Sequence, residues 1–409
     1  MAMVSSCGTG GGSGAESRYT DEECEAASDG LADGAMGDVG TGDETDNGNS
    51  QAGVITAGEW CDLAHWPYWS KLMLGDDFSD KSEYWQFFTN NRVAVAVTDQ
   101  DGKALAGVSV KLQRVADDGQ TADIWETVTD NHGEANCWVG LCQKQTAAPT
   151  LLRISIDGRM MEGEPVVCPW DSLQGGDPAV EMVSERYVNH YAIATQRTVR
   201  QQADIAFIVD ATGSMGDEID FLKNDLEDII TKTASVRPGT TMRTAALFYR
   251  DEGDEYLTRH SDFTENIDDT KAFVSKQEAD GGDDYPEAVH TAMERMLQDL
   301  SWDSNARTRL AFLILDAPAH HETDVIRSLQ WSVTQCARQG IRIIPVAASG
   351  VDKETEFMLR FFAITTGGTY VFITNDSGVG FDHIAASVGS YKVEQLNSLI
   401  VRLISHYTE

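Results

Sequence analysis

The clearest fold signal in the chain is the stretch Asp204-Ile205-Ala206-Phe207-Ile208-Val209-Asp210-Ala211-Thr212-Gly213-Ser214-Met215, in which an apolar run ends in a polar loop. An unbroken apolar run is typical of a strand that is buried on both faces. Apolar residues at helical spacing follow the loop, namely Ile219, Leu222, Leu226, Ile229 and Ile230. We therefore predict a buried strand, a polar loop and an amphipathic helix, in this order.

The alternation of strand and helix continues to the C-terminus. Further strands are predicted over residues 244–249, 256–263 (a short edge strand), 310–315, 341–347 and 370–373. Further helices are predicted over residues 288–300, 325–336 and 393–404. The first of these follows Pro286 and carries Glu287 in its first turn, and the second is stopped by Gly340. This order predicts a doubly wound, Rossmann-like α/β sheet over residues 185–409.

The N-terminal part of the chain has other patterns. Residues 91–184 alternate valines with polar residues between Asp-Gly turns, which predicts a small all-β sandwich. Within it, residues 95–110 and 129–135 resemble carboxypeptidase regulatory-like domains, a family of β-sandwiches without catalysis of their own. Residues 54–90 form an aromatic-rich connecting segment, which either packs on a neighbouring domain or offers a sugar-binding platform. Residues 1–53 are acidic and nearly devoid of apolar side chains, so we expect a disordered spacer.

The composition narrows the classes of function. The chain has 409 residues, of which 41% are hydrophobic and 24% charged, as in a globular protein of two or three domains. Lys and Arg number 31 against 66 Asp and Glu, which gives a net charge of −35. Such a surface repels phosphate groups, so we expect no nucleic-acid partner, whereas divalent cations suit it. No apolar run reaches the ~18 residues of a membrane-spanning helix, so none is predicted.

Two features concern the cellular compartment. The segment Val4-Ser5-Ser6-Cys7-Gly8 resembles the cleavage site ahead of a lipidated bacterial cysteine, although Cys7 could equally be an incidental residue of the tail. Lipidation would place the protein outside the cytoplasm, tethered to a bacterial cell envelope or surface. Of the seven cysteines, Cys137, Cys142 and Cys168 are close enough in sequence to suggest one disulfide. Cys336 is predicted to be a buried thiol on the apolar stripe of its helix.

Oxygen-bearing side chains follow the strands of the predicted α/β sheet. Ligands of such sheets bind beyond the carboxyl ends of the strands. Three loops bring candidate metal ligands to this edge, namely Asp210, Thr212, Ser214, Asp284 and Asp316, with Asp283 as the rival of Asp284. Hard oxygen donors of this kind suit Mg²⁺ or Ca²⁺, and waters or a partner must complete the coordination shell. The alternative is a vestigial site held by hydrogen bonds alone.

Other polar side chains near these loops have less defined roles. Asp251, Glu252, Asp254 and Asp280 are expected to form a solvated acidic rim. His320 and His321 are either an ordinary surface pair or residues that contact the site or its partner.

The Asp-x-Thr-x-Ser loop and the later Asp316 resemble the von Willebrand factor type A domain and its metal-ion-dependent adhesion site, over roughly residues 202–409. The GGD-x-PE segment at 281–287 and the loop DxTGSM make the hemicentin-like branch the most similar. Asp284 stands where most members of the family have Thr, so up to three carboxylates would surround the cation. The resemblance implies a cation that captures an oxygen ligand from a protein partner, and the extra carboxylate implies a weaker pull on an anionic partner.

The sequence favours a binding protein over an enzyme. We find no nucleophile elbow, no HExxH segment and no phosphate-binding loop. We therefore expect a cation-dependent adhesion protein that is not an enzyme. Two alternatives stay open: a metal-assisted hydrolase that uses His320 as the base, and a metal-indifferent scaffold of a cell-envelope assembly.

Overall fold

The computed structural model describes residues 53–89, 91–116, 118–144, 151–168, 187–195, 198–282, 285–378, 383 and 385–409. Residues 1–52, which include Cys7 and all of the predicted spacer but Gly53, lie outside these residues, and so do Asp283 and Asp284.

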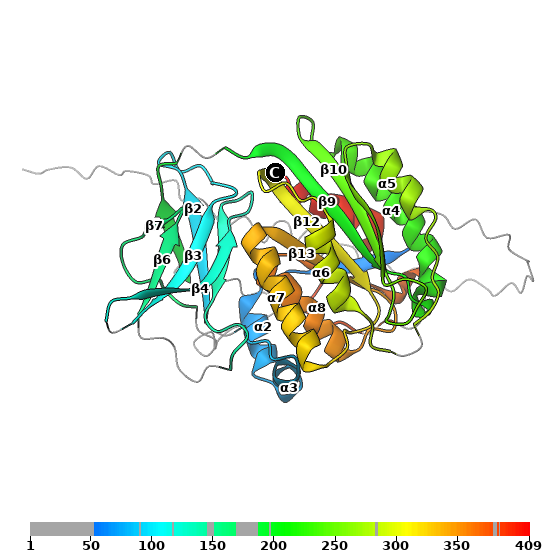
Figure 1. The fold of residues 1–409 in the computed structure, drawn as a ribbon, viewed down its shortest axis with the longest axis horizontal. Helices are drawn as coiled ribbons and strands as arrows, with labels where there is room; N and C mark the ends of the chain where they lie inside the picture. Colours follow the sequence, from blue (N-terminus) through cyan, green and yellow to red (C-terminus); the bar gives the residue numbers. More distant parts are fainter. Residues whose placement is uncertain are drawn as a thin grey trace, which may run out of the picture. The chain divides into compact units, whose positions relative to one another are not determined.

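The largest element is a mixed eight-stranded sheet with the strand order β11-β10-β9-β12-β13-β14-β1-β15 (Figure 1). Its parallel centre consists of β9 (Arg200–Asp210), β10 (Thr241–Tyr249), β12 (Ala306–Leu315), β13 (Ile341–Ala347) and β14 (Tyr370–Ile373). Antiparallel strands complete both edges: β11 (Thr258–Thr264) on one side, β1 (Thr56–Trp60) and β15 (Glu394–Gln395) on the other.

Helices cover both faces of this sheet (Figure 1). One face is covered by α4 (Gly216–Val236), α5 (Ile267–Val274) and α9 (Leu396–Tyr407), the other by α6 (Val289–Asp299), α7 (Thr323–Gln339) and α8 (Lys353–Thr366). Side chains of a strand alternate between faces. Accordingly, Ile205, Phe207 and Val209 of β9 belong to the core under α4 and α9, whereas Ala206 and Ile208 belong to the opposite core. The predicted doubly wound α/β sheet is confirmed.

The sequence did not reveal α5 and α8. Of the 14 residues of α8, 12 are buried, and they include both apolar and charged side chains. A helix that is buried on every side has no polar face, so the helical period that marks an amphipathic helix is missing. Helix α7, which is amphipathic, ends as predicted at Gly340, whose φ of 65° is the left-handed conformation that glycine adopts readily.

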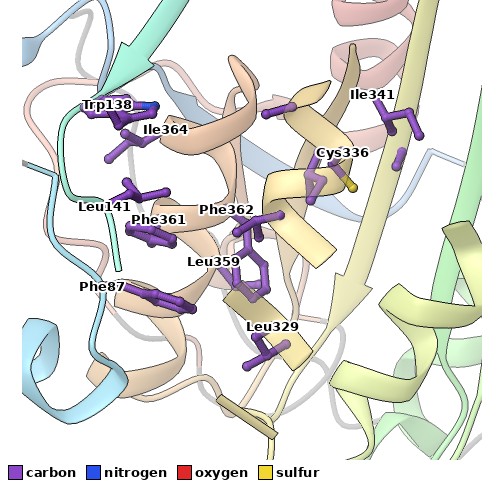
Figure 2. Packing of buried hydrophobic residues seen from close by; sticks show 14 of the residues in the cluster. Phe87, Trp138, Leu141, Leu329, Cys336, Ile341, Leu359, Phe361, Phe362 and Ile364 are labelled. Carbon is purple, nitrogen blue, oxygen red and sulfur yellow. The ribbon is translucent and has the colours of Figure 1, made fainter. Parts of the chain in front are cut away.

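Residues 54–90 are part of the α/β unit and do more than connect two domains. Strand β1 pairs with β14, and the segment continues as α2 (Trp66–Met73) and α3 (Asp76–Trp85). The ring of Phe87 stacks on Phe361 of α8 with 4.0 Å between the ring centroids (Figure 2). Trp66, Trp69 and Trp85 are also buried, so these rings pack in the core, which is the first of the two expected alternatives, whereas Tyr84 is exposed.

Two small sheets lie between this segment and β9 in sequence. One has the order β5-β2-β8 and the other β4-β3-β6-β7. Their strands are β2 (Arg92–Thr98), β3 (Ser109–Val115), β4 (Thr121–Val128), β5 (Glu134–Trp138), β6 (Leu152–Ile156), β7 (Arg159–Met160) and β8 (Val188–Ala192). Strand β8 falls within the predicted 185–409 unit but pairs in parallel with β2, so the boundary lies after β8.

The predicted disulfide among Cys137, Cys142 and Cys168 is wrong. Cys137 and Cys142 are free thiols, which leaves no pair to form a bridge within this group. Burial raises the pKa of the Cys142 thiol to about 12, so it has little thiolate character. The predicted buried thiol of Cys336 is confirmed, because this side chain has no exposed surface.

Gly368 lies where two backbone segments pass close to each other. It lies between α8 and β14, and a Cβ at this position would come within 1.9 Å of the carbonyl oxygen of Ile343. We expect Gly368→Ala to lower the free energy of unfolding by about 2–3 kcal/mol or more, because two backbone segments must separate. Urea unfolding measures this effect. The control is Gly216→Ala, where a Cβ meets no atom within 4 Å; an equal loss in both variants would contradict the prediction.

Candidate metal centre

The carboxyl ends of the two central strands bring Asp210 and Asp316 to the same edge of the sheet. Asp210 is the last residue of β9, and Asp316 follows directly after β12. The two strands run in parallel, with Val209 paired to Ile314. Both carboxyl groups are buried, with exposed fractions of 0% and 5%. The structure thus places these two predicted ligands together.

The loop after β9 forms a short row of hydrogen-bonded oxygens. Oδ1 of Asp210 accepts hydrogen bonds from the backbone N–H of Thr212 at 2.9 Å and from its hydroxyl at 2.7 Å. The hydroxyls of Thr212 and Ser214 are 3.2 Å apart. Asp210 and Thr212 are buried whereas Ser214 is exposed, so the row leads from the core to the surface.

A glycine-rich loop crosses beside this row. The carbonyl of Gly281 accepts from the backbone N–H of Gly213 at 2.9 Å. Gly282 has a φ of 70°, and a Cβ there would lie 2.8 Å from both Thr212 and the carboxylate of Glu287. Only glycine combines this conformation with such a close approach. The predicted ligand Asp284 and its rival Asp283 come next in the chain but lie outside the described residues.

The sequence predicted Glu287 in the first turn of a helix, but the structure places it at the candidate metal site. Helix α6 begins at Val289, and Glu287 instead forms a parallel bridge with Ala319. Its backbone N–H donates to the carbonyl of Pro318 at 2.8 Å. The side chain is 2% exposed, and its Oε2 atom accepts no hydrogen bond within the described part of the chain. The loop that follows Asp316 therefore holds Glu287 in place.

Burial raises the pKa values of two carboxyl groups at the site. It raises the pKa of Asp210 to about 6, against the opposing effect of the Thr212 hydrogen bonds. Burial also raises the pKa of Glu287 to about 9, and the neighbouring charges of Asp210, Asp251 and Asp316 add to this shift. Negative charges in a water-poor site repel one another and stabilise the protonated forms. A divalent cation would remove this repulsion.

Two expectations about the surrounding residues need correction. Asp251 does not belong to a solvated rim: it is 5% exposed, and its Oδ1 lies 2.9 Å from Nε2 of His320. Asp254 is half-buried, and its carboxylate accepts from the backbone N–H groups of Asp251 and Gly282, both at 3.1 Å. Glu252 and Asp280 are exposed, as expected of a rim.

The two histidines are not a matched surface pair. His320 is bonded to Asp251 as described above. His321 stacks on Tyr84, with 3.4 Å between the ring centroids, and its Nε2 lies 2.8 Å from the Tyr84 carbonyl oxygen. His321 therefore fixes α3 to the loop after β12.

Arg250 joins the loops and was not singled out by the sequence. Its Nε donates to the carbonyl of Ala211 at 3.1 Å and its Nη2 to the carbonyl of Glu278 at 2.8 Å. The side chain is 5% exposed. No sequence pattern distinguishes a single arginine after a strand, so only the structure could reveal this contact.

The donor set fits a hard cation that is partly hydrated. Within the described ranges, no three His, Cys, Asp or Glu side chains converge closely enough to hold a metal ion by themselves. A cation at this edge would therefore need hydroxyls and waters for part of its coordination shell, as Mg²⁺ and Ca²⁺ permit. Asp210 Oδ2 is buried without a hydrogen bond of acceptable geometry in the described residues, although the Tyr249 hydroxyl lies near enough to influence the pKa of Asp210.

The raised carboxyl pKa values predict how stability depends on pH. Between an ordinary carboxyl pKa near 4 and the folded values of about 6 and 9, the folded state binds protons that the unfolded state has lost. The cation-free protein should therefore become less stable as the pH rises from 5 to 9, and Ca²⁺ should restore stability most at the high end. Thermal unfolding at several pH values, with and without Ca²⁺, tests this.

The control for the pH experiment is Glu287→Gln, which should flatten the decline between pH 6 and 9. An unchanged decline in this variant would assign the effect to general repulsion within a chain of net charge −35.

Comparisons with known proteins agree with the fold of the α/β unit. Residues 204–338 match the family described as von Willebrand factor A domain. The chain is 32% identical over 121 residues to a protein of Acanthamoeba polyphaga mimivirus described as an ariadne-like RING finger protein. That alignment covers 30% of this chain and 12% of the viral protein.

Domains of this family commonly mediate metal-dependent protein interactions. Within the described residues, no helix is long and apolar enough to cross a membrane. The matched region contains β9, the loop that bears Asp210, Thr212 and Ser214, and the loop that bears Asp316. Residues 204–338 of this chain therefore match the von Willebrand factor A domain in sequence, and the α/β sheet that they form agrees with this match.

Proposed function

We propose that the chain is a protein-binding adhesion protein whose interaction depends on a divalent cation. Asp210, Thr212, Ser214 and Asp316, together with Asp284, would hold Mg²⁺ or Ca²⁺. The observation that supports this most is the hydrogen-bonded row from the buried Asp210 to the exposed Ser214, which lies beside Asp316 at the carboxyl edge of the sheet.

The exposed end of the row is where a partner would bind. Hard cations take six or more oxygen ligands, and the chain supplies too few of these. A carboxylate or another oxygen of a protein partner would occupy an open position. Because several carboxylates already surround the cation, we expect a weaker pull on an anionic ligand than at a site built mainly from hydroxyls.

The wider assignment is part of the same proposal. We propose membership of the hemicentin-like branch for the A domain and a carboxypeptidase regulatory-like β-sandwich for the two small sheets. We also propose an extracytoplasmic protein of a bacterial envelope or surface that is tethered through Cys7, a residue outside the described part of the chain.

We propose binding, not catalysis, as the role of the site. The Asp251–His320 contact at 2.9 Å orients an imidazole and is the feature that a metal-assisted hydrolase would use as its base. We assign Ser214 to cation binding, because its hydroxyl continues the oxygen row 3.2 Å from that of Thr212.

Titration calorimetry of the purified chain with MgCl₂ and CaCl₂ tests the proposal. We expect a dissociation constant in the millimolar range or tighter for at least one ion. No heat of binding at millimolar concentrations of either ion would overturn the proposal. Cation-dependent hydrolysis of a model ester that is lost with Asp210→Ala would favour the hydrolase instead.

A further inference from the structure

We propose that Glu287 is a further residue of the cation site, which it joins through a water molecule bound to the cation. This inference rests on the proposed function, since it concerns the same cation. It assigns a role to a residue that lies outside the Asp-x-Thr-x-Ser loop and outside the Asp316 loop.

The backbone fixes Glu287 between the other loops. Its N–H bonds to Pro318 at 2.8 Å and it forms a bridge with Ala319, so it moves with the loop that carries Asp316. Its carboxylate and the side chain of Thr212 both lie within 2.8 Å of the position that a Cβ of Gly282 would occupy. Glu287 thus touches the space in which all three loops meet.

The chemistry of this position calls for a positively charged or hydrogen-bond-donating group. Glu287 is 2% exposed, and its Oε2 atom has no hydrogen-bond donor among the described residues. Asp210 Oδ2 is also buried and meets only the nearby Tyr249 hydroxyl among the groups that affect its pKa. Thr212 reaches the Glu287 carboxylate but leaves Oε2 unbonded. A buried carboxylate oxygen such as Glu287 Oε2 is costly unless a donor reaches it. A hydrated cation supplies both the charge and the O–H donors.

The distance to the cation follows from the grouping of the acids. The described residues hold no set of three acids, histidines or cysteines that could bind one ion, so Asp210, Asp316 and Glu287 would not all contact it directly. Because Asp210 and Asp316 are the proposed direct ligands, Glu287 would act through a water on the cation. Residues that hold metal ligands in this indirect way change metal affinity by about 10–100-fold when they are replaced.

The test compares Glu287→Gln with wild type by calorimetry and by thermal unfolding, each with and without Ca²⁺ and Mg²⁺. Glutamine keeps the size of the side chain and removes its charge. We expect the dissociation constant to rise about 10–100-fold. We also expect the cation-free variant to unfold at the same temperature as wild type or higher, and the cation-induced rise in that temperature to shrink.

The control is Glu255→Gln, the same chemical change on a side chain that is 69% exposed in the neighbouring loop. It should leave the affinity within about twofold of wild type, as expected of an exposed charge. If Glu287→Gln binds the cation as tightly as wild type, Glu287 has no part in the site. If wild type itself shows no response to either ion, the result contradicts the proposed cation-dependent function and not only the role of Glu287. Should the Gln variant not fold, Glu287→Met provides the same comparison.

Discussion

We expect Asp210→Asn to lose on the order of 100-fold or more of the affinity for Mg²⁺ and Ca²⁺ while the protein stays folded. The change removes a negative charge from the centre of the oxygen row but keeps an oxygen that can accept from the N–H and hydroxyl of Thr212. A residue that coordinates a cation directly should matter more than an indirect one, for which the loss is about 10–100-fold. Calorimetry gives the affinity and circular dichroism the fold.

The matched control for Asp210→Asn is Asp280→Asn. The side chain of Asp280 is 81% exposed, yet its backbone N–H bonds to the carbonyl of Ala211 in the same loop at 3.1 Å. The control should bind the cation nearly as well as wild type. Equal affinity of Asp210→Asn and wild type would show that the row of oxygens does not hold the ion.

Arg360→Met should cost about 3–5 kcal/mol of unfolding free energy, because it leaves buried carboxylates without their counter-ion. Arg360 has no exposed surface. Its Nε donates to Asp62 Oδ2 at 2.9 Å and its Nη2 to Asp62 Oδ1 at 2.5 Å. Its Nη1 donates to Glu356 Oε1 at 3.1 Å. Urea unfolding followed by fluorescence measures the loss.

Arg402→Met is the control for Arg360→Met, because Arg402 also forms an ion pair with residues 54–90 but lies at the surface. Its side chain is 47% exposed and contacts Glu59 at 2.8 Å. An exposed pair contributes about 0–1 kcal/mol. Losses of similar size in the two variants would contradict the claim that the buried contact anchors residues 54–90 to α8.

The sequence predicted those parts of the fold that have a visible period. The apolar stripe of α4 and the alternating cores on either side of β9 follow from local spacing. Helix α8 was missed because it is buried all round, and the role of β1 was missed because its partner β14 is distant in sequence. Local patterns carry no information on such pairings.

The same distinction applies to the site. Asp210, Thr212 and Ser214 occupy alternate positions of one loop, so their proximity could be read from the sequence. Glu287 and Asp251 could not, since each owes its place to contacts with the loop after β12. A glutamate after a proline is typical of a helix start, and here a bridge to Ala319 replaced the expected first turn.

The pairing of β1 with β14 has a consequence for the order in which the protein assembles. The ribosome makes β1 and its aromatic helices before both small sheets and before most of the α/β unit, yet their binding surface is complete only when α8 and β14 have emerged. Until then, a strand without its neighbour and several large rings stay accessible to other chains. Nascent chains of this protein should therefore depend on chaperones until synthesis is almost complete.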